Sequence, residues 1–214
     1  MITFYFVRHG QTQWNSSGRY QGATDVPLSE IGKEQAKKAA AWFRDVHLDA
    51  VYSSDLSRAK DTAETIARTK GLSVSLHPGL REISFGDWEG LTYDEIEARW
   101  PGGIEAMYNH PATVRISGGE SFGDVEKRTM AAMKDIIAEV GMEDNGRGDE
   151  WEENGKTVLI VSHGGALRTI FCGLLGITVD KAWDFCQANA NISCIKYYGS
   201  RNLLFLLNST DHLK

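Results

Sequence analysis

Short apolar runs alternate along the chain with longer segments in which apolar residues recur every three or four positions. The runs have the length and composition of buried strands, and they lie at 2–7, 49–53, 73–76, 157–161, 191–197 and 203–207. Between these runs, apolar residues have the spacing of amphipathic helices. One such stripe consists of Ala36, Ala39, Ala40 and Phe43, and another of Met130, Met133, Ile137 and Val140. A further apolar helix is expected over 166–175.

This alternation predicts an α/β fold, a three-layer sandwich whose mostly parallel central sheet carries helices on both faces. The last two runs follow each other directly, which favours an antiparallel edge. We expect one domain over 1–214. The segment 93–117 begins with a short helical pattern near 93–100 and is then punctuated by proline and glycine, which predicts an irregular excursion beside the functional site. Residues 141–156 hold six acidic and two basic residues, which predicts a solvated acidic loop.

Composition narrows the classes of function. The net charge of −6 argues against a nucleic-acid surface and against adhesion to anionic membranes. No apolar stretch has the length of a membrane span, and the run at 2–7 is too short for a signal peptide. Cys172, Cys186 and Cys194 are odd in number and form no CxxC pair, so a reducing, cytoplasmic location is expected. The oligomeric state stays open, a homodimer included.

Two of the predicted strands end at a histidine followed by glycine. Arg8, His9 and Gly10 end the first run, and His163 with Gly164 ends the run at 157–161. The carboxyl ends of parallel strands form the edge of the sheet where ligands bind, so both imidazoles are expected there. Two further charged residues follow strands: Arg58 near the start of a helix that Ser54 or Asp55 can cap, and Glu82 after the third run.

These residue types suit phosphoryl transfer. An in-line nucleophile must meet phosphorus, cations and helix N-terminal amides must neutralise the equatorial oxygens, and a carboxyl group must protonate the leaving alcohol. Arginine donates two hydrogen bonds to phosphate at once, and cations beside a histidine lower its pKa and keep it unprotonated. The sequence has no Walker A motif, no HExxH and no compact Asp/His cluster, so we expect neither a metal nor a cofactor.

Two of these assignments have structural alternatives. Arg58 can instead form helical ion pairs with Asp55 or Asp61. Glu82 shares its segment with Asp87 and Glu89, either of which is a competing general acid.

Five segments together resemble a known family. The run RHGQTQWNSSGRYQGATDVPLSEIG at 8–32 closely resembles the opening block of the histidine phosphatase superfamily, the phosphoglycerate-mutase-like proteins. Four further segments resemble the later blocks of that family and follow in the same order as in the family. They are SSDLSRAKDTAE (53–64), LREISFGDWEGLT (80–92), GGES (118–121) and VSHGGALR (161–168). The resemblance covers most of the chain, and the five blocks together are highly specific.

The resemblance implies a role for nine residues. His9 is similar to the phosphohistidine nucleophile, Glu82 to the general acid/base, and the remaining catalytic positions are Arg8, Arg58 and His163 of the phosphate pocket. Four more residues resemble positions that bind the substrate or its phosphate in the family: Asn15, Gln21, Gly22 and Gly164. For Asn15 and Gln21 the competing interpretation is that they organise turns.

We therefore predict a metal-independent phosphatase that hydrolyses a small phosphorylated metabolite through a phosphohistidine on His9. The segment that follows Glu82, ISFGDWEG, resembles the phosphatase branch, and no Arg-Arg pair occurs in the chain. The alternatives are a 2,3-bisphosphoglycerate-dependent phosphoglycerate mutase and a non-catalytic module that binds phosphorylated ligands. The substrate stays open, and a second anionic group on it has three candidate partners, Arg81, Arg99 and Arg115.

Overall fold

The computed structural model describes residues 1–141, 155–199 and 201–214. Its strands form one sheet in the order β3-β2-β4-β1-β5-β6. They are β1 (Ile2–Arg8), β2 (Ala50–Ser53), β3 (Val74–Leu76), β4 (Lys156–Ser162), β5 (Ile192–Tyr197) and β6 (Asn202–Ser209). The helices are α1 (Gln13–Ser16), α2 (Glu30–Trp42), α3 (Ser57–Arg68), α4 (Tyr93–Arg99), α5 (Gly103–Asn109), α6 (Phe122–Val140) and α7 (Gly164–Leu175), with short 3₁₀ turns between them.

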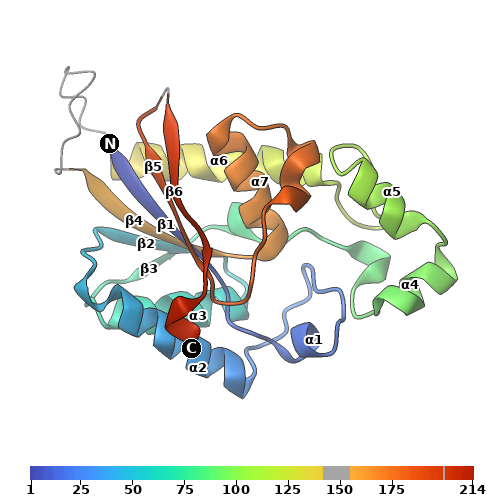
Figure 1. Cartoon of the computed structure of the whole chain (residues 1–214), viewed down its shortest axis with the longest axis horizontal. Coiled ribbons are helices and arrows are strands. Elements are labelled where there is room, and N and C mark those ends of the chain that lie inside the picture. Colours follow the sequence, from blue (N-terminus) through green and yellow to red (C-terminus); the bar gives the residue numbers. More distant parts are fainter. Residues whose placement is uncertain (142–154, 200) are drawn as a thin grey trace.

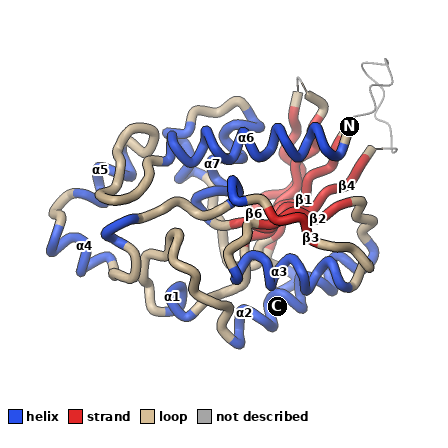
Figure 2. The backbone as a smooth tube through the Cα atoms, turned by 180° about the vertical axis from the view of Figure 1, so that it is seen from behind, coloured by secondary structure: helices blue, strands red, loops and turns tan. Residues whose placement is uncertain are grey.

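Helices cover both faces of this sheet, as predicted. Helices α6 and α7 lie on one face and α2 and α3 on the other (Figures 1 and 2). Successive side chains of a strand point to opposite faces, so β1 contributes to two separate cores. Phe4 and Phe6 belong to the core beneath α6 and α7, whereas Val7 belongs to the core beneath α2 and α3.

The sheet confirms the predicted fold class. β3, β2, β4 and β1 are parallel to one another, and β5 pairs antiparallel with both β1 and β6. Each predicted strand and each helix that was predicted from an apolar stripe is present, with ends that differ by a few residues. The antiparallel edge lies at β5 and β6, where two consecutive apolar runs predicted it.

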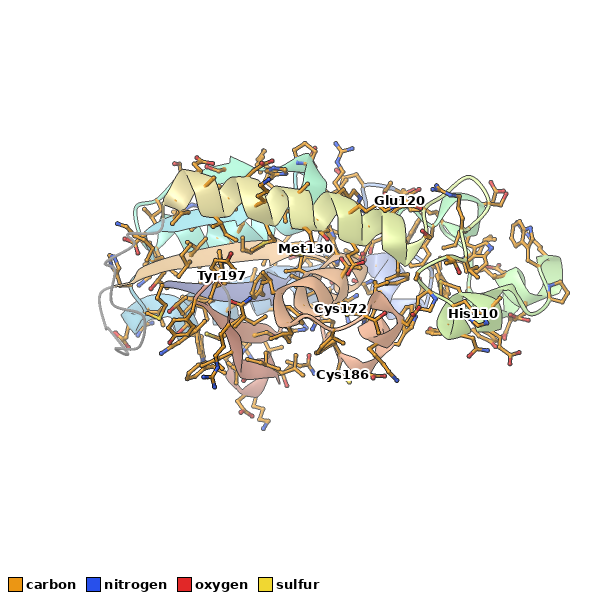
Figure 3. All side chains as sticks on the ribbon, turned by 90° about the horizontal axis from the view of Figure 1, so that it is seen from above. His110, Glu120, Met130, Cys172, Cys186 and Tyr197 are labelled. Atoms are coloured by element: carbon orange, nitrogen blue, oxygen red, sulfur yellow. The ribbon has the colours of Figure 1, made fainter. Side chains whose placement is uncertain are left out.

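Two close approaches of the backbone depend on glycine. A Cβ on Gly32, in the first turn of α2, would clash with the carbonyl oxygen of Gln11, and one on Gly10 would clash with the carbonyl of Gly32. The loop that follows β1 is thereby packed directly on α2. On the opposite face, Gly173 lets Met130 of α6 approach α7, next to Cys172, and the two helices pack against each other (Figure 3).

The prediction that Ser54 or Asp55 caps the Arg58 helix is wrong. Leu56 is the N-cap residue of α3 and makes no side-chain capping bond. The amide of Ser57 instead donates to Asp25 Oδ1 at 2.9 Å, from a loop more than thirty positions earlier. Asp55 is bound to Arg81 at 2.7 Å and is not available. A carboxylate from another loop therefore does what a local cap was expected to do.

In the segment 93–117, α4 lies where the short helical pattern predicted a helix, and α5 follows it in the part that was expected to be irregular. A capping box between Thr92 and Glu95 starts α4, and Ile96, Ile104 and Met107 are buried in the main core. The loop between the end of α6 and the start of β4 was predicted to be acidic, and most of it, 142–154, lies outside the described residues.

Candidate active site

The ends of β1 and β4 bring the two histidines together. Arg8 pairs with Ser162 in the parallel register of these strands, so the next residue of each strand is a histidine at the same edge. The rings of His9 and His163 lie 5.1 Å apart between centroids, and both side chains are buried, at 2% and 0% exposure. Sequence-distant strands thus build the centre of the site by their register alone.

Hydrogen bonds assign a tautomer to His9. Its Nδ1 lies 2.7 Å from the carbonyl oxygen of Gly10, and a carbonyl only accepts, so Nδ1 carries the proton. The lone pair of the neutral ring is then on Nε2. His9 also lines a cavity, so this arrangement presents an unprotonated nitrogen to whatever the cavity holds.

His163 has the opposite tautomer. Nε of Arg58 donates to Nδ1 of His163 at 3.2 Å, and a guanidinium only donates, so the ring proton is on Nε2. That Nε2 is buried and has no hydrogen-bond partner among the described residues. A buried donor without a partner is costly, which indicates that a ligand oxygen completes it.

Burial and positive charge keep both imidazoles neutral. Removal from water lowers the pKa of His9 well below its ordinary value, and the charges of Arg58 and Arg8 lower it further. The pKa of His163 is lowered in the same way, first by burial and then by Arg58, His9 and Arg8. Burial also lowers the pKa of Arg8 and of Arg58 to about 10, so both arginines keep their charge at neutral pH.

Arg58 lies at 0% exposure behind the two rings rather than on the surface. Its Nη2 donates to the carbonyl of Gly22 at 2.7 Å and its Nη1 to that of Thr24 at 2.9 Å. The nearest of its carboxylate neighbours is Asp25, at 3.9 Å, so the helical ion pairs with Asp55 and Asp61 do not form. Gly22 therefore contributes a carbonyl that orients Arg58.

A cavity of about 230 Å³ opens beside the histidines. Of the nine predicted site residues, six line it: Arg8, His9, Asn15, Gln21, Glu82 and Gly164. The other three, Arg58, His163 and Gly22, form the connected layer behind His9. The structure thus brings all nine together, although they come from four separate parts of the chain, 8–22, 58, 82 and 163–164.

Glu82 is the carboxylate that faces this cavity. Its oxygens accept hydrogen bonds from the amides of Gly165 at 3.1 Å and Ala166 at 3.0 Å, in the first turn of α7. The two competing carboxylates are engaged elsewhere. Asp87 accepts from Ser117 at 2.6 Å, and Glu89 accepts from the amides of Ala23, Thr24 and Phe85 and from the hydroxyl of Thr24.

Asn15 and Gln21 combine both interpretations that the sequence left open. Asn15 forms a capping box with Thr12 at the start of α1, and its Nδ2 donates to Gln21 Oε1 at 3.3 Å, so the pair organises the loop. Asn189 adds to this network by donating to Asn15 Oδ1 at 3.1 Å and to the carbonyl of His9 at 3.3 Å. Both Asn15 and Gln21 nevertheless line the cavity.

Several cavity residues escaped the sequence analysis. They are the polar Arg19 and Arg168 and the aromatic Tyr20, Phe85, Tyr108, Phe122 and Trp183. Arg168 belongs to the block VSHGGALR, and its place four residues after Gly164 on a helix was the available signal. The three arginines considered for a second anion lie elsewhere: Arg81 and Arg115 pair with Asp55 and Asp124, and Arg99 is exposed.

Metal ligands do not cluster in the part of the chain that the structure describes, where no three His, Cys, Asp or Glu side chains are grouped to hold an ion. None of the described helices combines the length and hydrophobicity that crossing a bilayer requires.

Two buried histidines, buried arginines and a carboxylate around one small cavity define the class of a phosphate-processing α/β enzyme. The model of the histidine phosphatase superfamily, branch 1, matches residues 4–210. Phosphoserine phosphatase 1 of Hydrogenobacter thermophilus is 36% identical over all of this chain and 95% of its own length. Glucosyl-3-phosphoglycerate phosphatase of Mycobacterium tuberculosis is 37% identical over 90% of this chain and 83% of its own.

A solved structure gives the same result for the fold. YhfR of Bacillus stearothermophilus superposes with a TM-score of 0.87 at 30% identity, with full coverage of both chains. The chain belongs to the histidine phosphatase superfamily, and it is an enzyme of the phosphatase type.

Proposed function

We propose that the protein hydrolyses a small phosphate monoester in two steps, with a phosphohistidine on His9 between them. The observation that carries this proposal is the pair of opposite tautomers. His9 offers a lone pair on Nε2, whereas His163 offers a proton on Nε2, and the rings are 5.1 Å apart. One ring is therefore suited to attack phosphorus, and the other to bind an equatorial oxygen.

In the first step, Nε2 of His9 attacks phosphorus in line, and the bond to the leaving oxygen breaks. Arg8, Arg58 and the Nε2 proton of His163 stabilise the charge on the equatorial oxygens, a type of interaction whose loss costs ~3–4 kcal/mol per donor in other enzymes. Glu82, in its protonated form, gives its proton to the departing alcohol. Geometry supports this assignment, because Glu82 lines the same cavity as His9.

In the second step, water attacks the phosphohistidine. Glu82, now a carboxylate, accepts the proton of that water, and His9 leaves as a neutral imidazole while inorganic phosphate is released. Amides of Gly165 and Ala166 bind the carboxylate form of Glu82, so the group has partners when it is ionised. The residue therefore serves as acid in one step and as base in the next.

Trapping the intermediate tests the proposal. Wild-type protein mixed with a radiolabelled ester and quenched in alkali is expected to carry acid-labile, base-stable phosphate on His9. His9→Ala should lose both label and turnover, whereas His163→Asn should label more slowly, still on His9. Label on His163, or turnover by His9→Ala near the wild-type rate, would contradict the mechanism.

A mutase activity is the alternative, in which the bound product takes back the phosphoryl group. We favour hydrolysis, because the relatives described above are named as phosphatases and the segment after Glu82 is ISFGDWEG. Given 3-phosphoglycerate and a bisphosphoglycerate primer, the protein should release phosphate faster than it forms 2-phosphoglycerate. Isomerisation without phosphate release would reverse this choice.

We further propose that the enzyme works in a reducing, cytoplasmic compartment. Cys172, Cys186 and Cys194 are all free thiols, and the first and third are buried. Thiols of this kind persist where glutathione keeps cysteines reduced.

A further inference from the structure

Arg168 lines the cavity, and the proposed mechanism does not use it. Arg168, one helical turn after Gly164 on α7, folds back so that its Nη1 lies 3.1 Å from the position that a Cβ on Gly164 would occupy. Nε of Arg8 lies 3.5 Å from the same position. Two arginines therefore converge on one point at the start of α7.

Both arginines are held by one segment. The carbonyl of Phe185 accepts from Nε of Arg168 at 2.9 Å, and the carbonyl of Gln187 accepts from Nη1 of Arg8 at 2.6 Å. Arg168 also stacks over the ring of Trp183, at 4.9 Å. Cys186, labelled in Figure 3, marks this segment below α7. Alternate residues of one segment thus fix the direction of two guanidinium groups.

The remaining donors of these groups have no hydrogen-bond partner among the described residues. Nε of Arg8 is buried without a hydrogen bond, and no hydrogen bond to the described residues engages Nη1 or Nη2 of Arg168. Burial lowers the pKa of Arg168, so the protein holds this charge at a cost. The edge of a planar guanidinium with two free N–H groups is the shape that binds a carboxylate in two places.

Charge points to the same conclusion. A phosphate ester dianion brings two negative charges, which Arg8 and Arg58 match. Glu82 faces the cavity as well, but in the proposed first step it is the protonated acid while the ester is bound. Arg168 is then a guanidinium with no anion, so a substrate without a further negative group would leave it uncompensated.

We infer that Arg168 forms a second anion subsite, which selects phosphate esters whose alcohol carries a carboxylate a few atoms from the ester oxygen. The spacer is short because Arg168 folds back onto Gly164, and side chains one helical turn apart are separated by only ~5–6 Å. This inference rests on the proposed function for its phosphate position and adds the class of substrate.

A matched pair of ligands tests it. In 3-phosphoglycerate a carboxylate stands where sn-glycerol 3-phosphate has a hydroxymethyl group, and the rest of the two molecules is the same. Affinities are measured by calorimetry in the His9→Ala background, which separates binding from turnover. The carboxylated ligand is expected to bind ~10–100-fold more tightly, because one bidentate hydrogen-bonded contact between charged groups increases affinity by about this factor.

Arg168→Met in this background should remove that preference, weakening 3-phosphoglycerate ~10–100-fold and changing glycerol 3-phosphate less than ~3-fold. Arg168→Lys, which keeps the charge without the planar fork, should retain part of it. Arg115→Met, an exposed arginine away from the cavity, is the control and should change neither affinity. Thermal unfolding checks that each variant is folded.

Equal affinities of the two ligands in the His9→Ala background would overturn the subsite, and so would an equal loss of both ligands in Arg168→Met. Neither result would bear on the phosphohistidine. If instead the trapping experiment fails while the carboxylate preference depends on Arg168, the mechanism falls and the subsite stands.

Discussion

Nε of Arg58 donates a 3.2 Å hydrogen bond to Nδ1 of His163, whereas Nδ1 of His9 faces the carbonyl of Gly10. The two imidazoles, although they follow parallel strands at equivalent places, are therefore chemically different. A donor partner makes the Nε2 of His163 a hydrogen-bond donor, and an acceptor partner leaves a lone pair on the Nε2 of His9. This difference underlies the predictions below.

Glu82→Gln should affect substrates according to their leaving group. An alkyl alcohol needs a proton to leave, so kcat on a glycerol or sugar phosphate should fall ~10²–10⁴-fold. p-Nitrophenolate leaves with little help, and the loss on p-nitrophenyl phosphate should be much smaller. Initial rates on both substrates measure the contrast.

Glu89→Gln provides the comparison for Glu82. Glu89 accepts hydrogen bonds from the loop at Ala23 and Thr24, so its loss should lower the rate on both substrates by a similar factor. A leaving-group effect in the Glu89 variant, and none in the Glu82 variant, would move the acid role to Glu89.

Stability should decrease in acid because His163 is buried and neutral. In the unfolded chain this histidine gains a proton as the pH falls below its ordinary pKa of 6.5, whereas in the folded chain its pKa lies well below that value. The unfolded state then binds more protons, so the free energy of unfolding falls with decreasing pH, by up to ~1.4 kcal/mol per pH unit for each such group.

Urea unfolding of wild type and His163→Asn at pH 7, 6 and 5 measures this contribution, since other titrating groups cancel in the difference. The wild type should lose stability more steeply than the variant below pH 6.5. Parallel pH profiles of the two proteins would mean that the buried ring takes up its proton without unfolding.

Gly32→Ala should weaken both the fold and the site. A Cβ at this position meets the carbonyl of Gln11, two residues after His9, and backbone cannot move as a flexible side chain does. Overpacking of this kind costs ~1–3 kcal/mol of stability, and the displaced loop should raise KM. Lys33→Ala, at the exposed neighbouring position, should change stability by less than ~0.5 kcal/mol.

A chelator should leave turnover unchanged. The positive charges that the proposed mechanism uses belong to arginine side chains. In the part of the chain that the structure describes, no group of three or more His, Cys, Asp or Glu side chains could hold a metal ion. Incubation with EDTA followed by assay on p-nitrophenyl phosphate measures this. Activity that is lost with EDTA and restored by Mg²⁺ or Zn²⁺ would require a different account of phosphate binding.

Much of the architecture was predictable because its signals are local. Strands such as β1 and β4 are apolar runs bounded by turn residues, and α2 repeats its alanines at helical spacing. Parallel strands that end in His9 and His163 imply a shared edge, so the centre of the site followed from the same signals. The ordered blocks of family resemblance implied a role for Glu82 and added the loop of Asn15.

Other features depend on contacts between distant segments. The cap of α3 comes from Asp25, and the choice of Glu82 over Glu89 depends on which carboxylate the amides of α7 and of the loop at 23–24 engage. No pattern along the chain encodes such pairings, because they depend on how loops of different elements meet in space.

By itself, then, the sequence determined the α/β class and the edge of the sheet where His9 and His163 meet. The tertiary structure decided which nitrogen of each ring is protonated and that Arg168 reaches the same cavity. The physical reason is one of range: strand and helix periodicity arises from neighbours along the chain, whereas the position of a proton or a buried charge is set by atoms that only folding brings within 3 Å.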